Sequence, residues 1–206
     1  MTQLNPHSPY SHSQIVFIGA EGICIAADDV KMFLKAPDYE VFLYNSTSKQ
    51  YTRAPLSSWL SKYGALPFAK TGKYIVKAST GTIGGVAAQQ SFMMLGKGAD
   101  ARKQREIWTT EAIDVSEKVQ HILQHMCGVP EGSVSGVPLR VIRGLGDGKP
   151  EYMLNTLSVK KIATPKAAFT QPVGYQKVAS ELTLMLHYGK QDALKDLLEG
   201  TTDSRK

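Results

Sequence analysis

The chain has little cysteine, no long apolar run and no cluster of basic residues. Its two cysteines, Cys24 and Cys127, are far apart among 206 residues. They do not indicate a disulfide framework, although they could pair in an oxidising compartment. No stretch approaches the roughly 18 apolar residues of a membrane-spanning helix. The net charge is +6, but no run of five or more basic residues occurs. We therefore predict no nucleic-acid partner, while peripheral contact with an anionic membrane surface stays compatible with the charge.

The N-terminus lacks the apolar core of a signal peptide, because residues 1–13 are polar and rich in Ser, His and Pro. We predict a flexible segment over 1–13, one domain over 14–188, and a C-terminal helix with a loose tail over 189–206. The expected location depends on the native start. It is periplasmic or otherwise extracytoplasmic if a leader was removed, and cytoplasmic if Met1 is native.

Short runs of β-forming residues make up most of the chain and predict an antiparallel meander. Asn45–Lys49 is rich in turn residues and predicts a hairpin tip, so the glycosylation-like triplet Asn45-Ser46-Thr47 is interpreted as a turn. The strands are expected at residues 15–18, 23–26, 30–35, 40–44, 74–78, 85–94, 104–110, 137–143, 151–162 and 177–187.

Three segments have the periodicity of helices. In the first, over 55–64, Leu56, Trp59, Leu60 and Tyr63 share one face. The second is capped by Asp114 or Ser116 and ends before Gly128, and the third covers 191–199. These helices do not alternate regularly with strands, so the fold class is mainly β (α+β) with an antiparallel sheet.

No segment carries a recognisable cofactor or catalytic motif, and we predict no cofactor. The run 144–149 fails as a phosphate loop because Pro150 and a strand follow it instead of a helix. His121 and His125 have the i, i+4 spacing of metal ligands, but we find no carboxylate at useful spacing. We therefore predict two surface histidines and no metal. A thiol nucleophile at Cys127 would need a tertiary partner that the sequence does not show.

Two predicted strands, 15–18 and 41–44, are apolar on both faces. Burial between two layers explains such a strand in an ordinary domain. A sheet that packs helices on one face and curls around an apolar cavity would give the same pattern.

The stretch from Phe169 to Tyr175 predicts an anchored crossing before the last strand. Pro172 cannot donate to a sheet ladder, so it belongs outside the sheet. Gly174 permits a turn that most residues resist. We expect Phe169 and Tyr175 to fix the two ends of the crossing to the core.

The same segment carries a family resemblance. Phe169, Pro172, Gly174, Tyr175 and Val178 resemble the F-x-x-P-x-G-Y-x-x-V segment of the LolA/LolB-like lipoprotein-carrier superfamily. Other pieces agree in order over roughly residues 15–186: Asp38–Asn45 before Lys49–Tyr51, then Gly136–Arg140, then Asn155-Thr156.

The resemblance implies a half-barrel, in which a strongly curved antiparallel sheet holds about three helices, some on its concave side. Relatives keep acyl chains in the apolar hollow. For this chain it implies a non-catalytic binding protein of the bacterial cell envelope, with a lipid or lipoprotein-type ligand. The residues expected in the hollow are Leu56, Trp59, Tyr63 and Trp108.

Two other functions stay open. One is a protein-protein interaction module whose hollow is filled by its own helices, with a sheet edge or the last helix recruiting a partner or a second copy. The other is a metal- or thiol-dependent enzyme that uses His121, His125 and Cys127.

Overall fold

The protein is built on one open sheet of twelve strands. The structure is a computed structural model, and it describes residues 1–6, 12–63, 73–130, 133–145, 148–163 and 165–186. The strand order is β12-β6-β5-β4-β3-β2-β1-β11-β10-β9-β8-β7, and every neighbouring pair is antiparallel except β12 with β6. The strands are β1 Thr2–Leu4, β2 Ser13–Gly19, β3 Gly22–Ala27, β4 Val30–Lys35, β5 Val41–Asn45, β6 Gln50–Ala54, β7 Lys73–Ile83, β8 Val86–Leu95, β9 Arg102–Thr110, β10 Val137–Arg143, β11 Glu151–Ser158 and β12 Gln176–Lys177.

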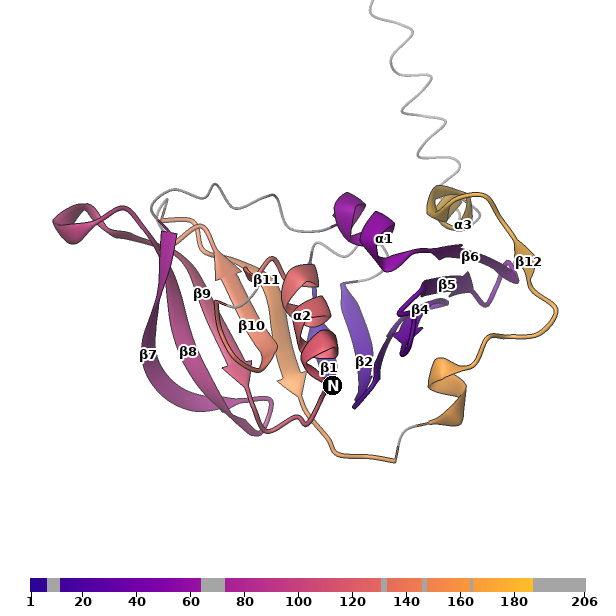
Figure 1. The fold of residues 1–206 in the computed structure, drawn as a ribbon, viewed down its shortest axis with the longest axis horizontal. Coiled ribbons are helices and arrows are strands. Elements are labelled where there is room, and N and C mark those ends of the chain that lie inside the picture. Colours follow the sequence, from indigo (N-terminus) through magenta and orange to yellow (C-terminus); the bar gives the residue numbers. More distant parts are fainter. Residues whose placement is uncertain (7–11, 64–72, 131–132, 146–147, 164, 187–206) are drawn as a thin grey trace, which may run out of the picture.

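The helix α2, Glu117–Met126, lies between two halves of this sheet, β2–β6 on one side and β7–β11 on the other (Figure 1). The described helices are α1 Leu56–Tyr63, α2 Glu117–Met126 and α3 Glu181–Leu186, with short 3₁₀ turns at η1 Gly98–Asp100 and η2 Lys166–Phe169. Within the described residues, no helix is both long and apolar enough to span a membrane.

The largest apolar cluster joins one face of the sheet to the helices. Because side chains alternate across a strand, every second residue of β2–β5 faces this cluster. Its members include Val16, Ile23, Met32, Leu34, Val41 and Leu43 from the strands, and Trp59, Val119, Ile122, Leu123 and Leu184 from the helices.

The opposite face of β2–β6 is covered by the segment that follows β11. Phe169 and Tyr175 pack there against a cluster that contains Phe33 and Phe42, and the Tyr44 and Tyr175 rings meet edge to face at 5.6 Å. Gly174 lies between the two anchors with a positive φ of 79°. The predicted crossing is therefore confirmed: an aromatic residue fixes each end, and the glycine makes the turn.

Burial on both faces accounts for β5, one of the two strands predicted to be apolar on both faces, whereas β2 leaves Ile15 49% exposed. Every residue of β5 is buried, with Val41 and Leu43 on the helix side and Phe42 and Tyr44 on the side of the crossing. Of the two explanations for this pattern, burial between layers is the one that applies to β5.

The predicted hairpin tip joins β5 to β6. Asn45 is fully buried, and its side-chain oxygen accepts hydrogen bonds from the backbone N–H groups of Thr47 and Ser48, both at 2.9 Å. This side chain serves the turn, as the interpretation of the triplet required.

The strand predicted over 177–187 is wrong. In the described part of this segment, the strand β12 is limited to Gln176–Lys177, and Glu181–Leu186 forms α3. Ser180 caps the helix, because its hydroxyl accepts a hydrogen bond from the Thr183 N–H at 3.3 Å. Glu, Leu and Met, which make up most of this segment, are good helix formers. His187 and the helix predicted over 191–199 lie outside the described residues.

Two other boundaries differ from the predictions at the centre of the sheet. Thr2–Leu4 lies inside the segment predicted to be flexible, yet it forms β1 and pairs with both β2 and β11. The strand predicted over 151–162 ends at Ser158, which pairs with Thr2, the first residue of β1. The short β1 thus joins the two halves of the sheet.

Candidate functional site

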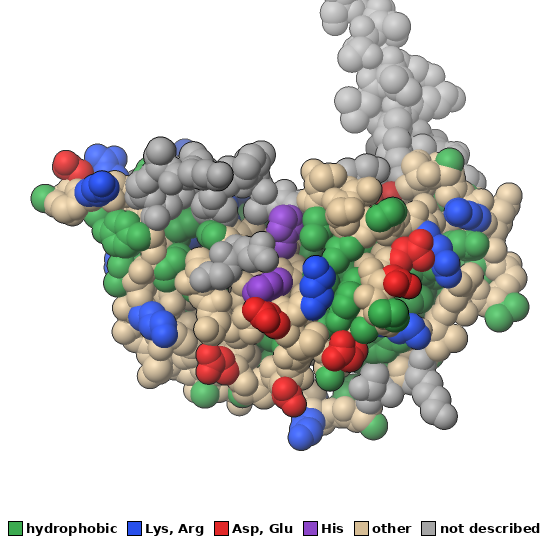
Figure 2. Space-filling model, viewed as in Figure 1, with side chains coloured by type: hydrophobic (Ala, Val, Ile, Leu, Met, Phe, Trp, Pro, Cys, Tyr) green, Lys and Arg blue, Asp and Glu red, His purple; other side chains and the backbone are tan. Residues whose placement is uncertain are grey.

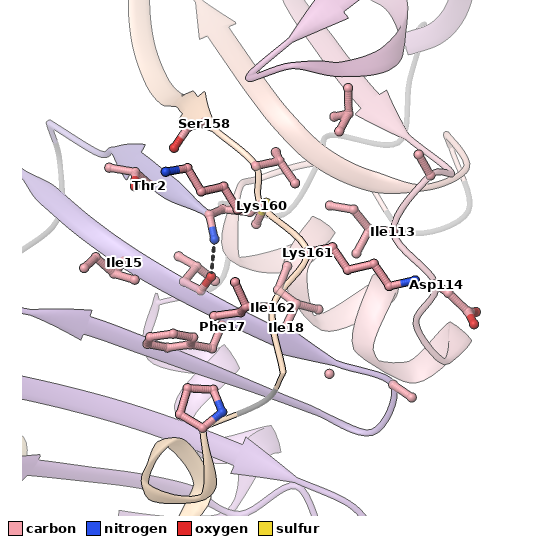
Figure 3. A pocket seen from close by; sticks show the side chains of 18 residues that line it. Thr2, Ile15, Phe17, Ile18, Ile113, Asp114, Ser158, Lys160, Lys161 and Ile162 are labelled. Carbon is pink, nitrogen blue, oxygen red and sulfur yellow. Dashed lines mark hydrogen bonds between the residues drawn. The ribbon is translucent and has the colours of Figure 1, made fainter.

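A pocket of about 570 Å³ lies beside β1 and β2 (Figure 3). One wall is residues 15–20 of β2 and the turn after it, and a second is residues 112–114 between β9 and α2. Residues 158–162, which follow β11, form the third. Met1, Thr2, Val86 and Pro165 complete the lining.

Most side chains that line this pocket are apolar. The aliphatic members Val16, Ile18, Ile113 and Val159 also belong to, or pack against, the apolar clusters of the core. Ile15 is 49% exposed and Ile162 is 58% exposed, so large apolar side chains also reach solvent at the pocket. The pocket is therefore an apolar recess that opens outward from the core.

Charged groups lie at the mouth. Lys160 and Lys161 leave the chain in opposite directions, Lys160 toward Thr2 and Lys161 toward Asp114 (Figure 3). Within the described chain, neither lysine makes an ion pair or a side-chain hydrogen bond.

The Met1 amino group donates a hydrogen bond to the Val16 carbonyl oxygen at 2.6 Å, and both residues line the pocket (Figure 3). Partial burial lowers the pKa of this amino group from its usual value near 8.0. The contact joins the start of β1 to β2 at the base of the pocket.

The residues predicted to line a hollow are divided between two clusters. Leu56 and Trp59 lie on α1 and pack in the main cluster, where Trp59 is 8% exposed. Trp108 lies on β9 and packs in a different cluster, and its indole N–H donates to Glu106 Oε1 at 2.5 Å. The side chain of Tyr63 is outside the described part. Leu56, Trp59 and Trp108 do not line the 570 Å³ pocket.

A smaller cavity of about 100 Å³ lies between β5, β6, α1 and the start of α3. Glu181 lines it and is only 8% exposed, and its Oε1 has no hydrogen-bond partner in the described chain. Burial raises the pKa of this carboxyl group from 4.5 to about 7. Arg53 also lines the cavity, but it pairs with Glu40 at 3.3 Å and donates to Gln171.

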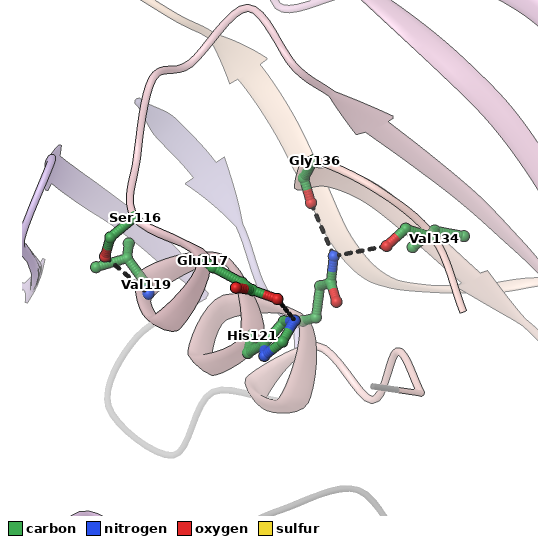
Figure 4. A network of polar contacts seen from close by, with 7 residues as sticks. Ser116, Glu117, Val119, His121, Val134 and Gly136 are labelled. Atoms are coloured by element: carbon green, nitrogen blue, oxygen red, sulfur yellow. Dashed lines mark hydrogen bonds and ion pairs between the residues drawn. The ribbon is translucent and has the colours of Figure 1, made fainter. Parts of the chain in front are cut away.

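His121, the first of the two histidines of α2, has a carboxylate neighbour that the sequence interpretation missed. Glu117 lies one turn before His121, at 3.8 Å between Oε1 and Nε2 (Figure 4). The histidine side chains in view in Figure 2 lie over α2 on the surface, and both residues are partly exposed. Even with Glu117, no group of three or more potential metal ligands occurs among the described residues.

The end of α2 is fixed by the buried side chain of Gln124. Gln124 donates hydrogen bonds to the carbonyl oxygens of Val134 and Gly136, at 3.1 and 3.0 Å (Figure 4).

The thiol of Cys127, the residue after α2, has a raised pKa. Burial raises the pKa of the Cys127 thiol to about 12. A thiol with this pKa holds almost no thiolate at neutral pH, so Cys127 is a poor nucleophile. Cys24 and Cys127 are both free thiols.

Comparison with known proteins does not show which family the chain belongs to. No protein-family model matches the chain, and no curated protein matches it either. The 570 Å³ pocket therefore supplies the argument for function. The sequence signal that could have indicated it is the run Lys160-Lys161-Ile162, where two cations adjoin an aliphatic residue just past a strand.

Proposed function

We propose that this protein is a non-catalytic binding protein that holds an acyl chain or a similar apolar ligand in the 570 Å³ pocket. The observation that carries the proposal is the pocket itself, with its volume and its largely aliphatic lining. Sites for small molecules are typically about 300–1,000 Å³, mostly apolar, with a few polar groups that orient the ligand.

The apolar lining supports a ligand with a hydrocarbon chain. Each methylene removed from water contributes about 0.8 kcal/mol, which corresponds to about a fourfold gain in affinity per methylene. The open mouth, with Ile15 and Ile162 exposed, would leave a polar head in contact with solvent.

We include in this proposal that the sheet forms a strongly curved half-barrel. In that arrangement the two halves of the sheet curve around helices on the concave side, and the position of α2 between them supports it (Figure 1). Side chains of α1 and α2 occupy the space where the resemblance implies an acyl chain. We therefore place the ligand at the β1–β2 pocket instead of at Leu56, Trp59, Tyr63 and Trp108. A role at the bacterial cell envelope with a lipid or lipoprotein-type ligand, outside the cytoplasm, is the part of the proposal that depends on the family resemblance.

Filling the pocket tests the proposal. Gly19 lines the pocket, and a Cβ there would meet no atom within 4 Å, so a larger side chain has room. The wild type should bind the uncharged fluorescent probe N-phenyl-1-naphthylamine, and straight-chain alcohols should displace it about fourfold more tightly per methylene. Gly19→Phe should weaken both the probe and the alcohols by about tenfold or more, since it fills the volume that they need.

The matched control is Ser57→Phe, which adds the same ring at an exposed position of α1 outside the pocket lining. It should bind the probe as the wild type does. Equal binding by the wild type and Gly19→Phe, with both proteins folded by circular dichroism, would remove the pocket as the binding site.

A further inference from the structure

The two lysines at the pocket mouth have different electrostatic surroundings. Lys161 extends toward the Asp114 carboxylate, whereas Lys160 extends toward Thr2 and Ser158, which carry no side-chain charge (Figure 3). Neither forms an ion pair within the described chain. The positive charge of Lys160 is therefore the one less offset by a nearby carboxylate.

An elongated amphiphile has one favourable orientation in such a pocket. Its chain is stabilised by the aliphatic lining, and its head stays at the mouth, where the charge of Lys160 is exposed. Asp114 on the other side disfavours an anionic head near Lys161. An anionic head beside Lys160 satisfies both conditions.

We propose that the pocket selects amphiphiles with an anionic head, of the class of long-chain carboxylates, and that Lys160 holds the head. This inference rests on the proposed function, because it assigns the head group of the ligand whose chain fills the same pocket.

The test compares decanoate with 1-decanol, which share a ten-carbon chain and differ in charge at pH 8. Both are measured by displacement of N-phenyl-1-naphthylamine from the wild type, Lys160→Gln, Asp114→Asn and Lys97→Gln. Lys97→Gln removes the same charge from an exposed turn residue that does not line the pocket.

The expected result is a loss of decanoate affinity in Lys160→Gln of up to about fivefold, the size of an exposed ion pair, with 1-decanol unchanged. Asp114→Asn should strengthen decanoate binding by about twofold, and Lys97→Gln should leave both ligands unchanged. Added salt should weaken the binding of decanoate and not that of 1-decanol, because it screens an exposed charge pair.

The outcomes separate this inference from the proposed function. If decanoate and 1-decanol bind alike and Lys160→Gln changes neither, the anionic head is excluded while the apolar pocket stands. If neither ligand displaces the probe from the wild type, the proposed function fails and takes this inference with it. Binding of the same variants to vesicles of phosphatidylglycerol is measured by co-sedimentation. If Lys160→Gln weakens only this binding, the lysine serves a membrane surface and the inference is overturned.

Discussion

At the scale of single residues, Phe169 couples the crossing segment to the sheet. Its ring lies so close to Gly22 that a Cβ added there would be 3.0 Å from Phe169 Cε1 and 2.9 Å from the Leu34 carbonyl oxygen. Gly22 is thus the position where the absence of a side chain lets an aromatic ring rest on the backbone of β3. Phe169 therefore acts in the packing of the fold, and it does not line the 570 Å³ pocket.

Removal of the Phe169 ring should destabilise the protein measurably. Phe169→Ala is expected to lower the free energy of unfolding by about 2 kcal/mol, less than the about 3–5 kcal/mol of a fully buried phenylalanine, because this ring is partly buried. Urea denaturation measures the change. Val173→Ala is the matched control in the same segment, since Val173 is 96% exposed and should have almost no effect. Equal effects of the two substitutions would contradict the anchor role.

Glu181 should make stability depend on pH near neutrality. Burial raises its pKa in the folded protein to about 7, above the usual 4.5. Its stabilising contribution is therefore complete below about pH 4.5 and is lost as pH rises through about 7. We expect Glu181→Gln to be more stable than the wild type at pH 8.5 by about 1–3 kcal/mol, with little difference at pH 5.

Urea denaturation at the two pH values measures this difference. Glu111→Gln, at an exposed carboxylate, provides the control and should track the wild type at both. A constant difference between Glu181→Gln and the wild type across pH would show that the Glu181 carboxyl group does not titrate in this range.

At the scale of elements, the sequence predicts the early hairpins correctly and the secondary structure of residues 177–187 incorrectly. The strands within 15–44 were predicted because short β-rich runs alternate with turn residues, and their partners are the next strands along the chain. The strand β6 was not among the predicted strands, although the predicted hairpin tip precedes it. Leucine stands at every second position in Leu182, Leu184 and Leu186, and this alternation led to the prediction of a strand where the structure has the helix α3. Three leucines at every second position also occur in a helix, and only the Ser180 cap and the missing strand partner decide between the two.

The N-terminus of α2 shows a boundary that the sequence could narrow but not fix. Asp114 and Ser116 were both possible caps. In the structure Ser116 caps the helix, since its hydroxyl accepts a hydrogen bond from the Val119 N–H at 3.4 Å. Asp114 lies at the pocket instead. The cap type was predictable from residue preferences, whereas the choice between two neighbouring caps depends on how the preceding loop packs.

At the scale of the whole molecule, the candidate site could not be predicted because its walls are distant in sequence. Residues 15–20 and 158–162 meet because β1 pairs with β2 on one side and with β11 on the other. The segment that contains residues 112–114 is held beside them by the Ser116 N–H, which donates a hydrogen bond to the Ala20 carbonyl oxygen at 2.9 Å. The hydrophobic pattern does not show which apolar residues line a recess and which are packed. Trp59 and Trp108 are the kind of residue expected to line a pocket, yet Trp108 packs against the core, and Trp59 packs in the core and lines the 100 Å³ cavity.

Native mass spectrometry of the protein purified gently from its own cells tests the central claim most directly. The account predicts a bound species with the mass of an acyl-chain compound, retained by the wild type and by Ser57→Phe and lost in Gly19→Phe. A wild type that is always ligand-free, and that binds neither N-phenyl-1-naphthylamine nor decanoate, would contradict the account and favour an interaction module whose interior is filled by its own helices.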